Sequence, residues 1–259
     1  MIWHIQQYLL HRWRAQGKKP LRSPFVFDFY QNVVKAPSNQ DIMGVAGLAR
    51  KLKKDKTIIQ RKDFGAGHGG KGGGVYSSTV GETARRSSRK QHEGRLLHHL
   101  VRHYQPGRML ELGSHLGISA LYQATAMAPE ARFISLEGDP GLAQLASGHL
   151  AEYGCNQVEL ITGPFSETLP ALNIPAYCPD YVFIDGDHRY EPTVHYVQLI
   201  LPHMPANAIL ILDDIYWSKG MARAWNEIRQ SEKLTLTIDL FHFGLGFVNL
   251  EGPKEHICL

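Results

Sequence analysis

Short apolar runs alternate with helical patterns in the chain from Arg108 to Gln230. Each apolar run is long enough for one buried strand, and it ends in glycine or an acidic residue. The runs are RMLELG (108–113), RFISLEG (132–138), QVELITG (157–163), YVFIDGD (181–187) and AILILDD (208–214). The segments between them have the residue pattern of helices. Five such strand–helix units predict a parallel sheet with helices on both faces.

Two more apolar runs follow, LTLTIDLF (234–241) and LGFVNL (245–250). Because only residues 242–244 separate them, we expect an antiparallel hairpin at one edge of the sheet. The predicted fold is α/β, with a doubly wound, mostly parallel, seven-stranded, Rossmann-like sheet and an antiparallel last strand. Ligands of such sheets bind at the carboxyl ends of the strands, near the point where the strand order reverses.

The first part of the chain has a different pattern. We predict that residues 1–95 form a basic extension of helices and loops, a cap or lid, and that residues 96–259 form the catalytic domain. Ile2, Ile5, Leu9 and Trp13 recur at helical spacing beside basic residues. Such a helix can lie on a membrane surface, but we favour a cap on the domain or a contact in a homodimer. On a later helix we expect the histidines at 98, 99 and 103 to lie at the surface.

Composition limits the classes of protein. No apolar run approaches the length of a membrane-spanning helix, and three scattered cysteines without a C-x-x-C pair suit a reducing cytoplasm. The net charge of +4 conceals an asymmetry: residues 1–108 contain 21 Lys and Arg but six Asp and Glu. This segment therefore either packs against the acidic remainder or forms a surface for an anionic partner.

The segment DFGAGHGGKGGG, Asp63–Gly74, resembles a phosphate-binding loop. Such a loop needs a buried strand before its glycines and a helix directly after them. Here Arg61, Lys62 and Asp63 precede the glycines, and three more glycines follow Lys71. We therefore predict a flexible cover or substrate-side loop and not the cofactor site.

The first core strand ends in LELGSHLGIS, where glycines at 113 and 117 form a strand-to-helix turn. Missing side chains allow a ligand to approach the backbone at such a turn. The spacing differs from that of the dinucleotide motif G-x-G-x-x-G, and the carboxylate of Glu111 suits a cationic ligand better than a pyrophosphate. Glu137 ends the next strand, where an acidic residue accepts hydrogen bonds from the two ribose hydroxyls of an adenosine.

These features resemble the class I S-adenosylmethionine-dependent methyltransferases over roughly residues 95–250. The resemblance implies S-adenosylmethionine as the cofactor and a methyltransferase fold. It also implies the following cofactor-binding residues: Glu111, Gly113, Ser114, Gly117, Ser119, Glu137, Gly163, Phe165, Ser166 and Asp185.

Carboxylates follow two further strands. Asp185, Asp187 and His188 come after one strand, and Asp213 and Asp214 end the next. If these strands are neighbours, the carboxylates converge on one rim, and crowded carboxylates favour a cation. Oxygen ligands suit Mg²⁺ or another divalent cation. Alternatively, the carboxylates cap turns and hold the amine of the cofactor without a metal.

This pattern resembles the metal-dependent O-methyltransferases that act on catechols and caffeoyl-CoA, whose metal ligands match Asp185, Asp213 and Asp214. Those enzymes usually have Asn at position 214 and a catalytic Lys at position 188. The sugar O-methyltransferases of macrolide and aminocoumarin pathways share the D-G-D…D-D pattern, with an acid at Asp187. Asp187 and His188 are therefore the candidate catalytic bases, and histidine has the unperturbed pKa nearest neutrality.

The leading hypothesis is a cytoplasmic S-adenosylmethionine-dependent methyltransferase that acts on a hydroxyl of a small molecule. Its acceptor could be anionic, and a divalent metal could assist. One alternative is an RNA or protein acceptor, bound through the basic N-terminal region. Weaker alternatives are a dinucleotide-dependent oxidoreductase and a non-catalytic cofactor-binding protein.

Overall fold

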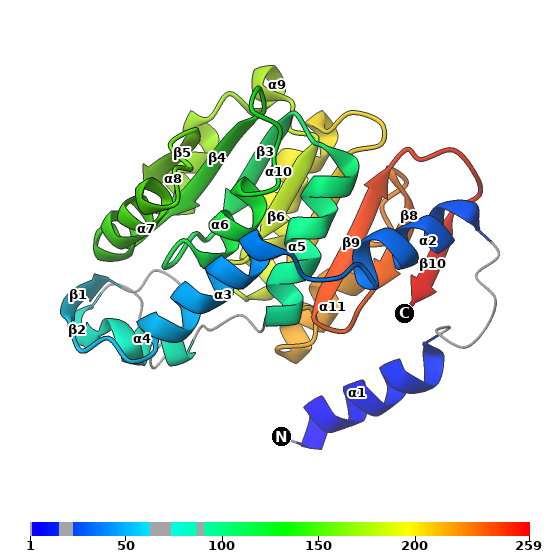
Figure 1. Ribbon diagram of the computed structural model, residues 1–259. Helices are drawn as coiled ribbons and strands as arrows, with labels where there is room; N and C mark the ends of the chain where they lie inside the picture. Colours follow the sequence, from blue (N-terminus) through cyan, green and yellow to red (C-terminus); the bar gives the residue numbers. More distant parts are fainter. Residues whose placement is uncertain (1, 16–22, 63–73, 87–90) are drawn as a thin grey trace. The chain divides into compact units, whose positions relative to one another are not determined.

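The computed structural model describes residues 2–15, 23–62, 74–86 and 91–259 (Figure 1). The chain divides into two units that do not follow its order. Unit 1 contains residues 1–23, 108–110 and 172–259, and unit 2 contains residues 24–107 and 111–171. The predicted glycine-rich loop, apart from Gly74, lies outside the described residues. The functional boundary between residues 95 and 96 stays a prediction.

Unit 1 contains one end of the main sheet and the first helix. Its helices are α1 (Ile2–Arg14), α9 (Ile174–Tyr177), α10 (Tyr190–Ile200), the 3-10 helix η3 (Leu201–His203) and α11 (Lys219–Ile228). Its strands are β6 (Tyr181–Ile184), β7 (Ile209–Asp213), β8 (Leu234–Asp239), β9 (Phe243–Val248) and β10 (Glu255–Cys258). Every residue of β6, β7 and β9 is buried, as expected for strands that are covered on both faces.

Unit 2 contains the other end of the sheet, a small hairpin and most of the N-terminal region. Its helices are α2 (Pro24–Phe29), the π-helix η1 (Tyr30–Val34), α3 (Gln40–Leu52), α4 (Val80–Arg86), α5 (Gln91–Tyr104), α6 (Ile118–Ala124), α7 (Pro140–Glu152) and α8 (Phe165–Ala171). Its strands are β1 (Ile58–Lys62), β2 (Val75–Thr79), β4 (Arg132–Glu137) and β5 (Val158–Thr162). β3 (Arg108–Leu112) begins in unit 1 and ends in unit 2.

The main sheet has the order β10-β8-β9-β7-β6-β3-β4-β5. The α/β fold with a mostly parallel sheet is confirmed, but the sheet has eight strands and not seven. β8 and β9 pair antiparallel as predicted, and β9 also pairs antiparallel with β7. β10 pairs parallel to β8 on its outer side, so the predicted position of the hairpin at the sheet edge is wrong. The segment 255–258 is too short and too polar at its start to be predicted as a strand.

The N-terminal region contains strands that the sequence did not predict. β1 and β2 form a separate antiparallel pair, with Ile58 opposite Thr79 and Lys62 opposite Val75. The residues of β1 alternate between exposed and half-buried, and three of the five are polar. Such a strand shows no continuous apolar run in the sequence. The segment from residue 77 to residue 94 has the polar composition of a connecting loop, but it includes α4 and the start of α5.

The prediction of surface histidines on α5 is wrong for two of the three. His98 and His99 are 1% and 6% exposed. The Nδ1 atom of His98 lies 3.1 Å from the carbonyl oxygen of Tyr122, and its Nε2 atom lies 3.0 Å from Nδ2 of Asn39. His103 is more exposed and pairs with Asp28 at 2.7 Å. The first turns of α3, through Asn39, are thereby fixed to α5 within unit 2.

None of the described helices is long and apolar enough to cross a membrane. In α1, the side chains of Ile5, Leu9 and Trp13 are 52%, 61% and 83% exposed. His4 and His11 of the same helix form hydrogen bonds to the backbone oxygens of Tyr216 and Asp239 in unit 1. This helix thus contacts its unit through its two histidines and through Tyr8, whose ring lies 5.2 Å from that of Phe241, whereas Ile5, Leu9 and Trp13 are exposed.

Candidate active site

The turn after β3 is fixed to the neighbouring strand β4. Gly113 and Gly117 have φ angles of 108° and 77°, a region that favours glycine. The N–H groups of Gly113 and Ser114 both donate to the carbonyl oxygen of Leu136, at 2.9 and 3.1 Å. A Cβ atom at position 117 would lie 3.1 Å from Ala146 of α7. Both glycines are therefore required, one by the turn and the other by the turn and by helix packing.

A buried hydrogen-bond network between side chains of β3, β4 and α6 stabilises this turn. Glu111 is 0% exposed, and its carboxylate accepts hydrogen bonds from Gln123 at 2.9 Å and from Ser135 at 2.5 Å. The hydroxyl of Ser114 bonds in turn to that of Ser135. Ser119 is buried in α6, and its carbonyl oxygen accepts from Gln123 at 3.0 Å. The side chains of Glu111 and Ser114 thus stabilise the turn, and their direct contact with a cofactor stays a prediction.

Glu137 lies at the end of β4, where the sequence placed the acidic residue for a ribose. Its two carboxylate oxygens accept hydrogen bonds from different backbone N–H groups, that of Asp139 at 2.8 Å and that of His115 at 2.6 Å. Burial raises the pKa of Glu137, whereas these two hydrogen bonds oppose that shift. The N–H group of Gly163 donates to the carbonyl oxygen of Glu137 at 2.9 Å. The carboxylate is therefore held in one orientation by the turns after β3 and β4, and the backbone carbonyl of Glu137 is bonded to the turn after β5.

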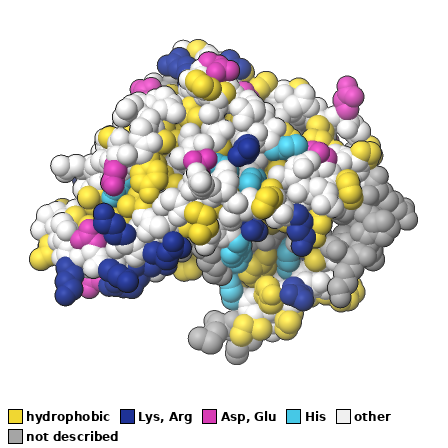
Figure 2. All heavy atoms as spheres, viewed as in Figure 1, with side chains coloured by type: hydrophobic (Ala, Val, Ile, Leu, Met, Phe, Trp, Pro, Cys, Tyr) yellow, Lys and Arg dark blue, Asp and Glu magenta, His cyan; other side chains and the backbone are white. Residues whose placement is uncertain are grey.

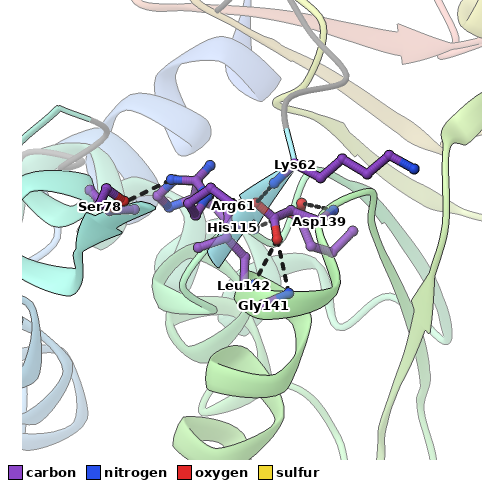
Figure 3. Close-up of polar contacts among 9 residues, drawn as sticks. Arg61, Lys62, Ser78, His115, Asp139, Gly141 and Leu142 are labelled. Atoms are coloured by element: carbon purple, nitrogen blue, oxygen red, sulfur yellow. Dashed lines mark hydrogen bonds and ion pairs between the residues drawn. The ribbon is translucent and has the colours of Figure 1, made fainter. Parts of the chain in front are cut away.

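Figure 3 shows a second acidic residue at this strand end, which the sequence analysis missed. Asp139 caps α7 by accepting from the N–H groups of Gly141 and Leu142. Its other oxygen pairs with the guanidinium of Arg61 at 2.6 Å and accepts from the N–H of Lys62 at 2.9 Å. Strand β1 is thereby attached to the start of α7.

The β1 segment also lies close to that helix through its backbone. A Cβ atom at Gly141 would lie 2.4 Å from the carbonyl oxygen of Gln60. Burial and the charge of Arg61 lower the pKa of His115, which lies within the glycine turn, to about 3. The dipeptide Asp139-Pro140 is a recognisable helix start, but its ion-pair partner in β1 could not be found from the sequence.

The turn after β5 contains the remaining predicted cofactor residues. Gly163 has a φ angle of 150°, and a Cβ atom there would lie 2.9 Å from Thr168. Phe165, at the start of α8, is half-buried, and Ser166 is exposed. Because β5 pairs with β4, this turn lies at the same end of the sheet as Glu137.

The predicted catalytic residues lie after β6 in unit 1. The Nε2 atom of His188 is 3.6 Å from a carboxylate oxygen of Asp185, and both side chains are half-buried. Asp187 has a left-handed backbone with a φ angle of 52°. The guanidinium of Arg189 donates to both carboxylate oxygens of Asp187, the longer bond being 2.7 Å. Burial, together with the charge of Asp187, raises the pKa of Tyr196 to about 12. His188 thus has an acidic neighbour, Asp185, whereas Asp187 has a basic partner, Arg189.

The two acidic residues at the end of β7 lie in different local surroundings. Asp213 is 7% exposed at the end of the strand, and Asp214 has a left-handed backbone with a φ angle of 51°. Among the described residues, the carboxylate oxygens of Asp185, Asp213 and Asp214 do not all lie within 4.8 Å of one another. The metal site of Asp185, Asp213 and Asp214 stays a prediction.

Comparisons with known proteins agree with the fold and with the glycine turn. Residues 110–215 match a family model described as a methyltransferase domain. A catechol O-methyltransferase of Mycobacterium tuberculosis is 32% identical over 130 residues, which are 50% of this chain and 57% of that protein. The chain thus spans about half the length of the curated relatives it matches.

Solved structures support the same fold. The O-methyltransferase of Bacillus cereus in complex with SAH has a TM-score of 0.58 at 18% identity, covering 86% of this chain and 97% of that one. TomG of Streptomyces achromogenes, an O-methyltransferase of tomaymycin synthesis in complex with SAM, has a TM-score of 0.58 at 20% identity, covering 87% and 96%. The segment 110–215 is therefore similar to methyltransferase domains, and the predicted resemblance of this chain to the O-methyltransferases is confirmed.

Proposed function

We propose that this protein transfers a methyl group from S-adenosylmethionine to a hydroxyl group of a small molecule. The observation that carries the proposal is the carboxylate of Glu137. It is held by two backbone N–H groups, one from the turn after β3 and one from the turn after β4. Acceptance of ribose hydroxyls at a strand end needs such a fixed carboxylate.

The residues of unit 2 fit a phosphate-free adenosine compound. The described turn from Gly113 to Gly117 contains no Lys or Arg, and the nearby guanidinium of Arg61 is neutralised by Asp139 at 2.6 Å. A pyrophosphate favours cationic partners. Glu137 is proposed to hold the ribose, the Gly113–Gly117 turn the methionine part, and the segment from Phe165 to Ser166 the adenine. S-adenosylmethionine supplies a methyl group that its sulfonium already activates.

His188 is proposed as the base that removes the proton of the acceptor hydroxyl. The nearby carboxylate of Asp185, at 3.6 Å, can stabilise the imidazolium that forms. Asp187 is less suited because Arg189 donates to both of its oxygens and stabilises its ionised form. The proposed proton transfer uses residues of the chain, and no step is assigned to a metal. Metal dependence stays a prediction.

Calorimetric titration with S-adenosylmethionine, S-adenosylhomocysteine and NAD tests the cofactor. We expect binding of the first two, a loss of about 10-fold or more for Glu137→Gln, and wild-type affinity for the exposed control Glu130→Gln. Binding of NAD alone would support an oxidoreductase and contradict the proposal.

Turnover with a set of catechols and related hydroxyl compounds tests the reaction. His188→Asn should lower kcat by about 100-fold and leave the affinity for S-adenosylmethionine unchanged, because a base acts in the chemical step. Cofactor binding with no turnover on any hydroxyl acceptor, and no effect of His188→Asn on function, would indicate a non-catalytic binding protein.

A macromolecular acceptor is the second candidate, and a basic surface of unit 2 favours it. Figure 2 shows Lys and Arg side chains gathered where α3, β1, β2 and α4 lie. The exposed cations there include Arg50, Lys51, Lys54, Lys56 and Arg85. Binding of RNA by these residues should weaken roughly 100-fold or more between low and physiological salt. Methylation of small hydroxyl compounds with no salt-dependent RNA binding would contradict this candidate.

A further inference from the structure

Three side chains of types that bind metals converge inside unit 1, and none of them has an assigned role in methyl transfer. They are His11 of α1, Asp239 at the end of β8 and Cys258 at the end of β10. One ligand atom from each lies within 4.8 Å of the other two, and all three residues are buried, with 7%, 2% and 9% exposed. The residues come from segments that lie 228 and 247 positions apart in the chain.

The cluster is held in position by its neighbours. Nε2 of His11 is 3.0 Å from a carboxylate oxygen of Asp239, and the thiol of Cys258 donates to the carbonyl oxygen of His11 at 3.6 Å. Asp239 also accepts from the hydroxyl of Tyr216 at 2.5 Å and from the N–H of Phe241 at 2.9 Å. These bonds fix the orientation of the carboxylate, as partners of metal ligands do.

Aromatic rings enclose the cluster. The ring of Phe241 lies edge-on to the imidazole of His11, with centroids 5.4 Å apart, and stacks on the ring of Tyr216 at 5.4 Å. Phe241 is 7% exposed and has a φ angle of 70°, which is uncommon for a bulky residue. Such walls keep bulk water away from the three polar side chains.

We propose that His11, Asp239 and Cys258 bind Zn²⁺ at a site that joins α1 to β8 and β10, with a water molecule as the fourth ligand. One nitrogen, one oxygen and one sulfur ligand suit Zn²⁺, whereas Mg²⁺ and Ca²⁺ take oxygen ligands. Tetrahedral ligands of Zn²⁺ are about 3.3–3.6 Å apart, given bond lengths of about 2.0–2.3 Å. The observed separation of 3.0 Å between His11 and Asp239 requires only a small opening.

The charges of the cluster balance with the metal bound. A carboxylate and a thiolate together neutralise one Zn²⁺, and His11 then binds as neutral imidazole. The buried cluster thus acquires no net charge, which matters because an unpaired buried charge is costly. A simple ion pair between His11 and Asp239 accounts for two of the residues but gives no role to the sulfur of Cys258.

The full-length, untagged chain with Co²⁺ or Zn²⁺ alone provides the test. Cobalt bound to a thiolate gives a charge-transfer absorption band in the near ultraviolet. We expect this band at one Co²⁺ per chain, its displacement by Zn²⁺, and protection of one thiol from alkylation. Cys258→Ser should abolish the band and weaken Zn²⁺ binding by at least about 100-fold. The matched control Cys155→Ser removes another buried cysteine and should retain both.

His11→Gln should likewise lose the band, because it removes the nitrogen ligand and leaves the thiol in place. Absence of a thiolate–cobalt band in the folded wild-type chain would overturn the proposal. A band that survives Cys258→Ser but is lost in Cys155→Ser would also overturn it. The result is independent of methyl transfer, because none of the three residues has a role in the proposed reaction.

Discussion

Lowering the pH should destabilise the protein through His98, which the fold keeps neutral. Burial lowers the pKa of His98 from 6.5 to about 4, with His99 and Arg102 adding to this shift and Tyr122 and Asp41 opposing it. The unfolded chain therefore binds a proton at a higher pH than the folded chain does. The contribution of His98 to stability is complete above about pH 6.5 and decreases as the pH falls through the window down to about 4.

The magnitude follows from these two pKa values. At about pH 5, nearly every unfolded chain has His98 protonated, whereas about one folded chain in ten does. The difference amounts to about 2 kcal/mol of unfolding free energy relative to neutral pH. His98→Gln keeps hydrogen-bonding groups near Asn39 and the Tyr122 carbonyl but cannot titrate. It should therefore lose about 2 kcal/mol less than the wild type over this pH change.

Urea unfolding of both proteins at about pH 7.5 and about pH 5 measures this difference. His103→Gln is the matched control, because His103 lies on the same helix with 28% of its side chain exposed. It should follow the wild type more closely than His98→Gln does. Equal losses of stability in the wild type and His98→Gln would refute the reasoning, since they would place the acid sensitivity elsewhere in the chain.

Three further predictions follow from contacts in unit 2 and from the proposed chemistry. Arg61→Gln breaks the ion pair that attaches β1 to the start of α7. It should weaken S-adenosylmethionine binding measured by calorimetry, and unchanged affinity would show that β1 does not support the cofactor site. Gly94→Ala places a Cβ atom 2.1 Å from the ring of Tyr122 and should lower the free energy of unfolding in urea by about 1–3 kcal/mol. Gly148→Ala, with open space around the new Cβ atom, should leave this free energy unchanged or raise it slightly. Exhaustive chelation should lower turnover and Mg²⁺ should restore it, as the predicted metal ligands Asp185, Asp213 and Asp214 require; turnover that stays intact would contradict the predicted metal.

The core of the fold could be predicted because its strands are buried on both faces. Val182, Phe183 and Ile211 belong to continuous apolar runs, which the sequence displays directly. The glycine turns at 113 and 117 could be predicted for a similar reason, since a left-handed backbone after an apolar strand favours glycine.

The parts that the sequence did not reveal depend on contacts between distant residues. Three of the five residues of β1 are polar, and its attachment to α7 depends on Asp139, which pairs with Arg61 and accepts from the Lys62 N–H. The sequence around His98 indicates a surface residue. The bonds that allow its burial come from Asn39, 59 positions away, and from a carbonyl oxygen of α6. Local pattern carries no information on such partners.

The two acidic residues of the predicted cofactor site, Glu111 and Glu137, show that residues of one motif can differ in role through their hydrogen-bond partners. Glu111 and Glu137 both belong to core strands and are both buried, so spacing alone gives them similar roles. Their partners differ: Glu111 accepts from two side chains of the core, whereas Glu137 accepts from backbone N–H groups of the adjacent loops. A carboxylate held by loop backbone lies where a ligand can reach it, and one held by core side chains stabilises the strand that carries the loop. A cofactor-binding assay on Glu137→Gln therefore tests ligand recognition, whereas the same change at Glu111 tests first of all the stability of the turn.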